Sequence, residues 1–142
     1  MIFFLSLLSL LFLEPQNHEV QGADLFVVVQ KTNSDKGKVL ILVFDKEDGF
    51  PDQVEKAFGK FAIAPKNGKV ELRLPDLLPG KYAVTVLHDE DNNEVMNTNF
   101  IGLPTEKYGF SNNPKIYFGP PNFEKAAVQT GNEDRTITIN LR

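Results

Sequence analysis

Residues 69–74 read KVELRL, and residues 136–141 near the C-terminus read TITINL. In both stretches every second side chain is apolar, and polar or charged side chains stand between them: Val70, Leu72 and Leu74 in the first, and Ile137, Ile139 and Leu141 in the second. A period of two predicts β-strands that place one face on a core and the other face in water.

Two further stretches are apolar on both faces. They are LFVVVQ at residues 25–30 and KVLILVFD at residues 38–45. This pattern is typical of central strands that are covered on both sides, or of strands that meet loops. Residues 82–88 form another predicted strand, and polar turns containing glycine at 33–37 and 66–68 have the short spacing of antiparallel connections.

A helical pattern occurs near residues 51–58, where Phe50, Val54 and Phe58 are spaced four apart around Pro51. It predicts one short helical turn that closes an end of the fold. Several strands without long intervening helices favour an all-β, antiparallel Greek-key sandwich of about seven strands, of the immunoglobulin type.

The N-terminal residues 2–13, IFFLSLLSLLFL, are apolar but too few to span a bilayer as a helix. They resemble the apolar core of a signal peptide, and the small residues Val20 and Gly22 suit a cut before Ala23. We therefore expect a leader at 1–22, a single domain at 23–142, and a periplasmic or secreted location. A buried N-terminal helix or strand and a retained anchor are the alternatives.

The composition excludes several classes of function. The 142 residues include no cysteine and no tryptophan, and the formal net charge is -4. Without cysteine there is no disulfide framework, no Cys-ligated zinc site and no thiol nucleophile. Without an excess of basic residues, a nucleic-acid partner is not expected. We expect a monomer with no integral membrane segment once the leader is removed.

The segment LPDLLPGKY at residues 74–82 contains a Pro-Gly turn that resembles the turn of transthyretin-like and carboxypeptidase-regulatory-like sandwich domains. Two longer blocks narrow the resemblance: HDEDNNEVMNTNFIGLPTEKYGFSNNP at 88–114 and GPPNFEKAAV at 119–128. They look like the bacterial domain-of-unknown-function family 2141. The resemblance implies a small exported transthyretin-like β-sandwich, without an established biochemical role.

The sequence departs from the usual pattern of that family at five positions: Asp91, Glu94, Met96, Asn97 and Lys107. The first four of these lie in a loop rich in Asp and Asn, residues 89–99, so the departures bear on any function that rests on that loop.

That loop is the candidate metal site, since oxygen-bearing side chains recur along it: Asp89, Asp91, Asn93, Asn97 and Asn99. Carboxylate and amide oxygens are the ligands that calcium prefers. The sixth loop position is Glu94 where an EF-hand needs Gly, and the twelfth is Phe100 where it needs Glu. The alternative is that these side chains cap their own turns by local hydrogen bonds and no cofactor is bound.

His88 is the only histidine of the expected mature chain, and it lies in phase with core-facing positions of its strand. It can hold a loop by hydrogen bonds, as most lone buried histidines do. It can also act as a general base in a small hydrolase with Asp89 and Ser111, although Ser111 lacks a G-x-S-x-G elbow.

The aromatic segment at residues 104–121 completes the candidate site. A binding surface for a ligand or partner would include six residues of this end: His88, Tyr108, Phe110, Ser111, Asn112 and Tyr117. Alternatively, its rings fold back to cover the sandwich. We expect an exported, non-catalytic binding or structural module, with a calcium-stabilised domain and the hydrolase as alternatives.

Overall fold

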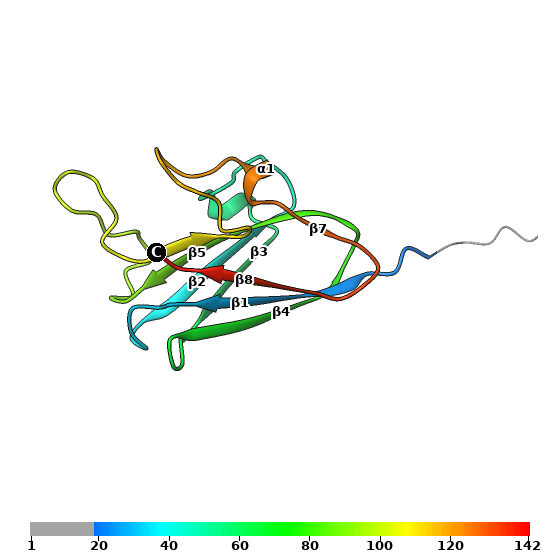
Figure 1. Cartoon of the computed structure of the whole chain (residues 1–142), viewed down its shortest axis with the longest axis horizontal. Helices are drawn as coiled ribbons and strands as arrows, with labels where there is room; N and C mark the ends of the chain where they lie inside the picture. Colours follow the sequence, from blue (N-terminus) through cyan, green and yellow to red (C-terminus); the bar gives the residue numbers. More distant parts are fainter. Residues whose placement is uncertain (1–18) are drawn as a thin grey trace, which may run out of the picture.

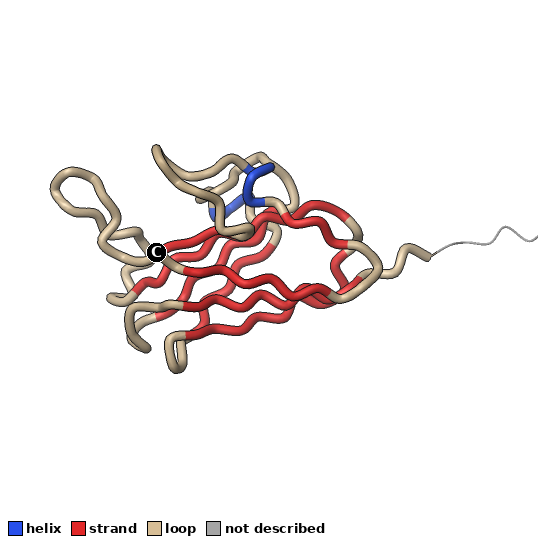
Figure 2. Tube along the Cα trace, viewed as in Figure 1, coloured by secondary structure: helices blue, strands red, loops and turns tan. Residues whose placement is uncertain are grey.

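The structure is a computed structural model in which residues 19–142 are described (Figures 1 and 2). Most of the predicted leader, residues 1–18, lies outside the described residues. Eight strands make up the fold: β1 Ala23–Gln30, β2 Lys38–Phe44, β3 Gly59–Ile63, β4 Lys69–Leu77, β5 Gly80–Asp89, β6 Tyr108–Phe110, β7 Val128–Thr130 and β8 Arg135–Asn140. The predicted all-β class is confirmed.

The strands form two sheets that pack face to face. One sheet has the order β4-β1-β8, and the other has the order β3-β2-β5-β6, with β7 paired to β5. Inward residues of both sheets share one core, which includes Val27 of β1, Ile41 of β2 and Val86 of β5. The alternation that the sequence predicts for 69–74 is confirmed at its ends, because Val70 and Leu74 are buried.

The pairing differs from the prediction in one respect. β8 pairs with β1 in the parallel direction, with Val27 opposite Ile137, whereas all other strand pairs are antiparallel. β1 lies between its antiparallel partner β4 on one edge and β8 on the other edge. The two short strands β6 and β7 also raise the number of strands above the seven that we expected, because three residues give too little alternation to detect.

The predicted helical turn is confirmed only as a 3-10 turn at Val54–Lys56. Its apolar residues do not form one buried face, since Val54 and Phe58 are exposed. Phe50 packs edge-on against Phe44, with ring centroids 5.5 Å apart. A second short helix, α1 Phe123–Ala126, was not predicted, and the side chain of Asn122 caps its N-terminus.

A second apolar cluster lies beside the main core. It joins Phe44, Phe110 and Phe123 around the half-buried Phe50. α1 and the loop before β3 are thereby attached to the sheet β3-β2-β5-β6. Among the residues that the structure describes, no helix is long and apolar enough to cross a membrane.

Candidate functional site

The C-terminal end of β5 places His88 and Asp89 side by side in sequence but in different surroundings. The His88 ring is fully buried. Its Nε2 lies 2.9 Å from the carbonyl of Lys36, and its Nδ1 accepts a hydrogen bond from the Asn33 N–H at 3.2 Å. A neutral ring with the proton on Nε2 satisfies both bonds. His88 therefore holds the loop between β1 and β2 against the end of β5, as one of its two interpretations predicts; because the ring is buried, it does not belong to the binding surface in which we also included it.

The predicted hydrolase arrangement is not assembled. Ser111 lies opposite Val84, where its hydroxyl accepts the Val84 N–H at 2.8 Å and donates to the carbonyl of Ala126. Val84 precedes His88 by four residues on β5, a separation of about 13 Å along an extended strand. The carboxylate of Asp89 bonds neither side chain, so the three residues share no hydrogen bond.

The segment after β5 folds back on the carboxylate of Asp89, which is almost fully buried. One oxygen accepts the N–H of Asn93 at 3.1 Å, and the other accepts the N–H of Glu94 at 2.9 Å. Both Asn92 and Glu94 have positive φ, which tightens the turn. Asp89 therefore shapes the loop through local hydrogen bonds, as one of the two alternatives for this loop predicts.

Two other residues of the predicted ligand set, Asn93 and Asn97, meet around Asp91. The side-chain amide of Asn97 donates to its carboxylate at 2.7 Å, and the amide of Asn93 donates at 3.2 Å. The hydrogen bond from Asn97 is the largest cause that holds the pKa of Asp91 below its usual value. Asn99 stands apart, because its side-chain oxygen accepts the N–H groups of Ile101 and Leu103 at the loop tip.

Glu106 joins this group, although the sequence analysis did not select it. Ligand atoms of Asp89, Asp91 and Glu106 lie within 4.8 Å of one another. The reason is strand register: β5 and β6 pair with Leu87 opposite Tyr108, so continuing the same register places Glu106 opposite Asp89. Glu106 is buried and accepts the N–H groups of Glu90 and Asn97.

No cation balances these three carboxylates within residues 19–142. The ion pairs of that part of the chain all lie elsewhere, for example between Arg73 and Asp24. Close carboxylates repel one another, and a hard cation with oxygen ligands relieves that repulsion. The chemistry of the donor set therefore fits calcium, with Asp89, Asp91 and Glu106 as its acidic members.

The aromatic segment divides into buried and exposed parts. Phe110 is buried, and Tyr108 packs against it with ring centroids 6.0 Å apart. Ser111 is fully buried and cannot belong to the exposed binding surface that we expected, whereas Phe110 keeps a small exposed area and lines a groove on the outer face of the sheet. Asn112 and Tyr117 are exposed. Asn112 bonds the carbonyls of Lys125 and Ala127, which fixes α1 beside β6; its side chain therefore supports the fold.

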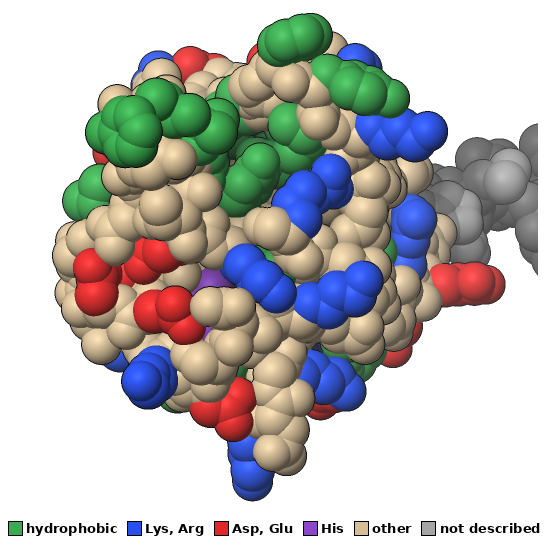
Figure 3. All heavy atoms as spheres, turned by 60° about the vertical axis from the view of Figure 1, so that its left-hand side comes forward, with side chains coloured by type: hydrophobic (Ala, Val, Ile, Leu, Met, Phe, Trp, Pro, Cys, Tyr) green, Lys and Arg blue, Asp and Glu red, His purple; other side chains and the backbone are tan. Residues whose placement is uncertain are grey.

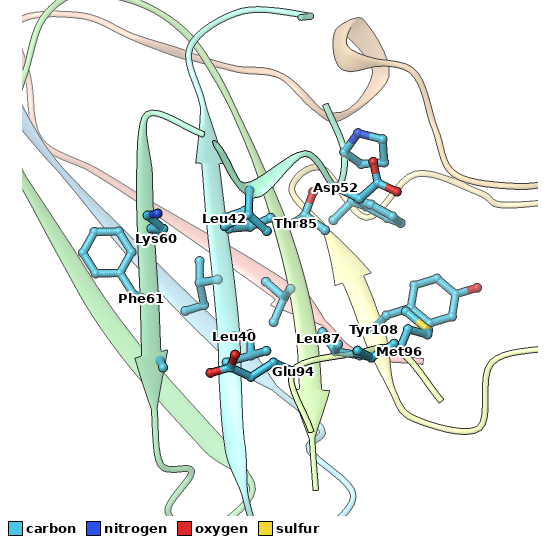
Figure 4. A pocket seen from close by; sticks show the side chains of 17 residues that line it. Leu40, Leu42, Asp52, Lys60, Phe61, Thr85, Leu87, Glu94, Met96 and Tyr108 are labelled. Atoms are coloured by element: carbon cyan, nitrogen blue, oxygen red, sulfur yellow. The ribbon is translucent and has the colours of Figure 1, made fainter. Parts of the chain in front are cut away.

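A groove of about 740 Å³ lies on the outer face of the sheet β3-β2-β5-β6. Its floor carries Leu40 and Leu42 from β2 and Thr85 and Leu87 from β5 (Figure 4). Asp52 belongs to the loop before β3. The other walls come from Tyr108 of β6, from Val95 and Met96 of the Asp/Asn loop, and from Lys60 and Phe61 of β3.

Apolar atoms make up most of the groove surface. The side chains of Asp52, Lys60, Thr85 and Glu94 add charged groups and one hydroxyl. The hydroxyl oxygen of Thr85 is buried and has no hydrogen-bond partner within the described chain. The sequence carried a signal for this site, because residues 38–45 are apolar on both faces. Val39, Ile41 and Val43 face the core, so Leu40 and Leu42 face outward into the groove.

Comparison with known proteins gives one match. Residues 27–138 match the family described as "Uncharacterized protein conserved in bacteria (DUF2141)", which covers most of both sheets. Searches among curated proteins and among solved structures give no match. The matched range includes β5, the Asp/Asn loop, β6 and the groove. The chain belongs to the DUF2141 family of bacterial proteins, as the resemblance in its sequence predicted.

Proposed function

We propose that this protein is an exported, non-catalytic, monomeric binding module, and that the groove on the outer face of β3-β2-β5-β6 takes an apolar ligand. The observation that carries the proposal is the groove itself. Its volume of about 740 Å³ falls within the range of about 300–1,000 Å³ that is usual for small-molecule sites. Export rests on the leader-like residues 1–22.

The lining supports an apolar ligand in particular. Leu40, Leu42 and Leu87 turn outward although an open sheet face normally carries polar residues. Lys60 and Asp52 stand at the rim, where they can fix the orientation of a polar end group.

A non-catalytic role is supported by the chemistry of the buried polar groups. His88 and Ser111 have their polar atoms engaged in hydrogen bonds to the backbone. Neither borders the groove. A general base must reach the proton that it abstracts, and His88 is fully buried.

The test uses residues 19–142, which contain both sheets and both apolar clusters, with anilinonaphthalene sulfonate as a fluorescent apolar probe. We expect Leu42→Ser to weaken probe binding about tenfold, because burial of a leucine side chain is worth about 1.5–3 kcal/mol. Phe26→Ser is the matched control, since Phe26 is an exposed apolar side chain on the other sheet. Circular dichroism verifies that both variants are folded.

Equal loss of affinity in Leu42→Ser and Phe26→Ser would contradict the proposal, because it would mean that the probe does not bind in the groove. No fluorescence change with the unsubstituted chain would contradict it as well. If binding is confirmed, a library of apolar compounds tested by displacement of the probe defines the ligand class.

A second candidate function is a calcium-stabilised domain, and we propose it because three carboxylates converge without a balancing cation in residues 19–142. Asp89, Asp91 and Glu106 would hold the ion, with the side-chain oxygens of Asn93 and Asn97 nearby. An ion at this position would join the end of β5 to the start of β6. The domain would then be more stable with calcium than with a chelator.

The melting temperature in millimolar calcium and in chelator tests this second candidate. We expect calcium to raise it, and Asp91→Asn to remove the rise. Glu94→Gln serves as the matched control, because this exposed carboxylate belongs to the same loop but not to the cluster. An unchanged melting temperature for the unsubstituted chain would refute calcium binding and leave the groove proposal unaffected.

A further inference from the structure

Two loops on either side of β6 end in apolar tips that project from the sheets (Figure 1). We define the loop tips as residues 99–103 and residues 117–119. Phe100 is 99% exposed and Phe118 is 100% exposed. Ile101, Leu103 and Tyr117 are also more than half exposed. Five large apolar side chains exposed on two neighbouring loops are unusual for a small domain, and they indicate an interaction surface.

Four of the five backbone N–H groups of the first tip are satisfied internally, and that of Phe100 is the exception. The side-chain oxygen of Asn99 accepts the N–H of Ile101 at 3.1 Å and the N–H of Leu103 at 3.0 Å. The backbone carbonyl of Asn99 accepts the N–H of Gly102 at 3.0 Å, and the N–H of Asn99 bonds the carbonyl of Leu103 at 2.8 Å. Pairing most of the donors in this way lowers the cost of moving the tip out of water.

The chain that directly follows the second tip has few backbone donors. Pro120 and Pro121 follow Gly119, and proline has no N–H. Tyr117 and Phe118 stand on the outer part of this tip. Tyrosine combines an apolar ring with a hydroxyl, which suits the boundary between hydrocarbon and water.

Charged side chains are unevenly distributed around the tips. Residues 95–105 contain no charged side chain, and residues 107–122 contain Lys107 and Lys115 but no acid. The acidic side chains nearest in sequence to the first tip lie at 89–94 and at Glu106, at the base of the first loop, and Glu124 of α1 follows the second tip. In Figure 3 hydrophobic side chains form two groups on this face; basic side chains lie beside the right-hand group, and acidic side chains lie below the left-hand group. Charged side chains are thus absent from the tips themselves, and Lys107 and Lys115 lie between the two tips in the sequence.

We propose that the two loop tips insert into the surface of a phospholipid bilayer that contains anionic lipid. Raised tips suit a deformable surface, which closes around each side chain, better than a protein surface that would need two matching pockets. Lysines beside the tips are attracted to anionic head groups, with about 1 kcal/mol for each residue near the surface. This proposal is independent of the groove, because the tip residues do not line it.

Cosedimentation of residues 19–142 with vesicles tests the proposal, and leaving out the apolar residues 2–13 removes their contribution. The vesicles contain phosphatidylcholine alone or phosphatidylcholine with phosphatidylglycerol, in buffer with calcium. We expect binding to the anionic vesicles that decreases in high salt. Phe100→Ser and Phe118→Ser should each weaken the partition about tenfold, since each ring loses its burial in lipid.

Leu78→Ser is the matched control, because Leu78 is an exposed leucine in the turn between β4 and β5, away from both tips. All three substituted side chains are exposed, so the fold should be preserved, and thermal melting verifies this. The absence of binding to anionic vesicles overturns the proposal. Vesicle binding that the Phe100→Ser, Phe118→Ser double variant retains also overturns it. A third result also overturns it: the unsubstituted chain binds no vesicles but associates with itself, and the double variant does not associate. The tips would then form a protein interface.

Discussion

Replacement of His88 by alanine tests how the end of β5 is held together. The ring is fully buried, and its two nitrogens bond the loop between β1 and β2 at Asn33 and Lys36. Alanine would leave a cavity worth about 2 kcal/mol. It would also leave the N–H of Asn33 and the carbonyl of Lys36 without their partner. Because Asn33 and Lys36 are partly solvated, we assign about 1 kcal/mol to each lost hydrogen bond.

The expected loss is therefore about 3–4 kcal/mol in the free energy of unfolding, which corresponds to a fall of about 10–15 °C in melting temperature for a domain of this size. Urea unfolding followed by far-ultraviolet circular dichroism measures it, since the chain contains no tryptophan. Amide hydrogen exchange adds a local readout, because the Asn33 N–H should lose protection.

His88→Gln is the matched variant, since glutamine offers one donor and one acceptor and should recover part of the loss. A change below about 1 kcal/mol in His88→Ala, with protection of the Asn33 amide unchanged, would refute the assigned structural role.

Two further predictions concern packing and pH. Gly109→Ala should destabilise the domain by about 1–3 kcal/mol in thermal melting, because a Cβ there would lie 2.9 Å from Cγ2 of Ile139 and 3.1 Å from Cδ2 of Leu141; an unchanged melting temperature would contradict this close approach of β6 and β8. The hydrogen bond from Arg73 holds the pKa of Asp24 below its ordinary value of 3.8. Because the pKa of Asp24 is lower in the folded chain than in the unfolded chain, its contribution to stability is complete above the unfolded pKa and is lost as the pH falls through the folded pKa. Melting temperatures measured from neutral to acidic pH should therefore fall less steeply in Asp24→Asn than in the unsubstituted chain. Identical profiles would contradict this contribution.

The sequence predicted the strands where alternation is long and regular. Val70 and Leu74 are buried as expected, and so are Ile137 and Ile139. Pairing was harder to predict, because strand alternation gives the face of a strand and not its neighbour. The parallel contact between β1 and β8 depends on where the chain returns after β7, which no local pattern encodes.

The helical pattern at Phe50, Val54 and Phe58 shows how short periodicities mislead. Three apolar residues spaced four apart fit a helix, but they also fit a loop that sends each side chain to a different place. Phe50 packs on the second apolar cluster, Phe58 packs edge-on against Tyr82, and Val54 borders the groove.

The candidate site was only partly accessible from sequence. Asp89, Asp91, Asn93 and Asn97 were selected and do lie together, because all belong to one tight loop. Glu106 was missed because it is 17 positions beyond Asp89 and meets it only through the register of β5 and β6. The groove was missed because its walls come from separate loops, although the outward leucines of β2 were visible.

The most direct test of the central claim, that the outer face of β3-β2-β5-β6 binds an apolar ligand, is chemical-shift mapping by nuclear magnetic resonance. Residues 19–142 labelled with nitrogen and carbon isotopes are titrated with anilinonaphthalene sulfonate. We predict that the largest shifts fall on the methyl groups of Leu40, Leu42 and Leu87 and on the amide of Thr85. Shifts confined to the outer face of β4-β1-β8 would contradict the account.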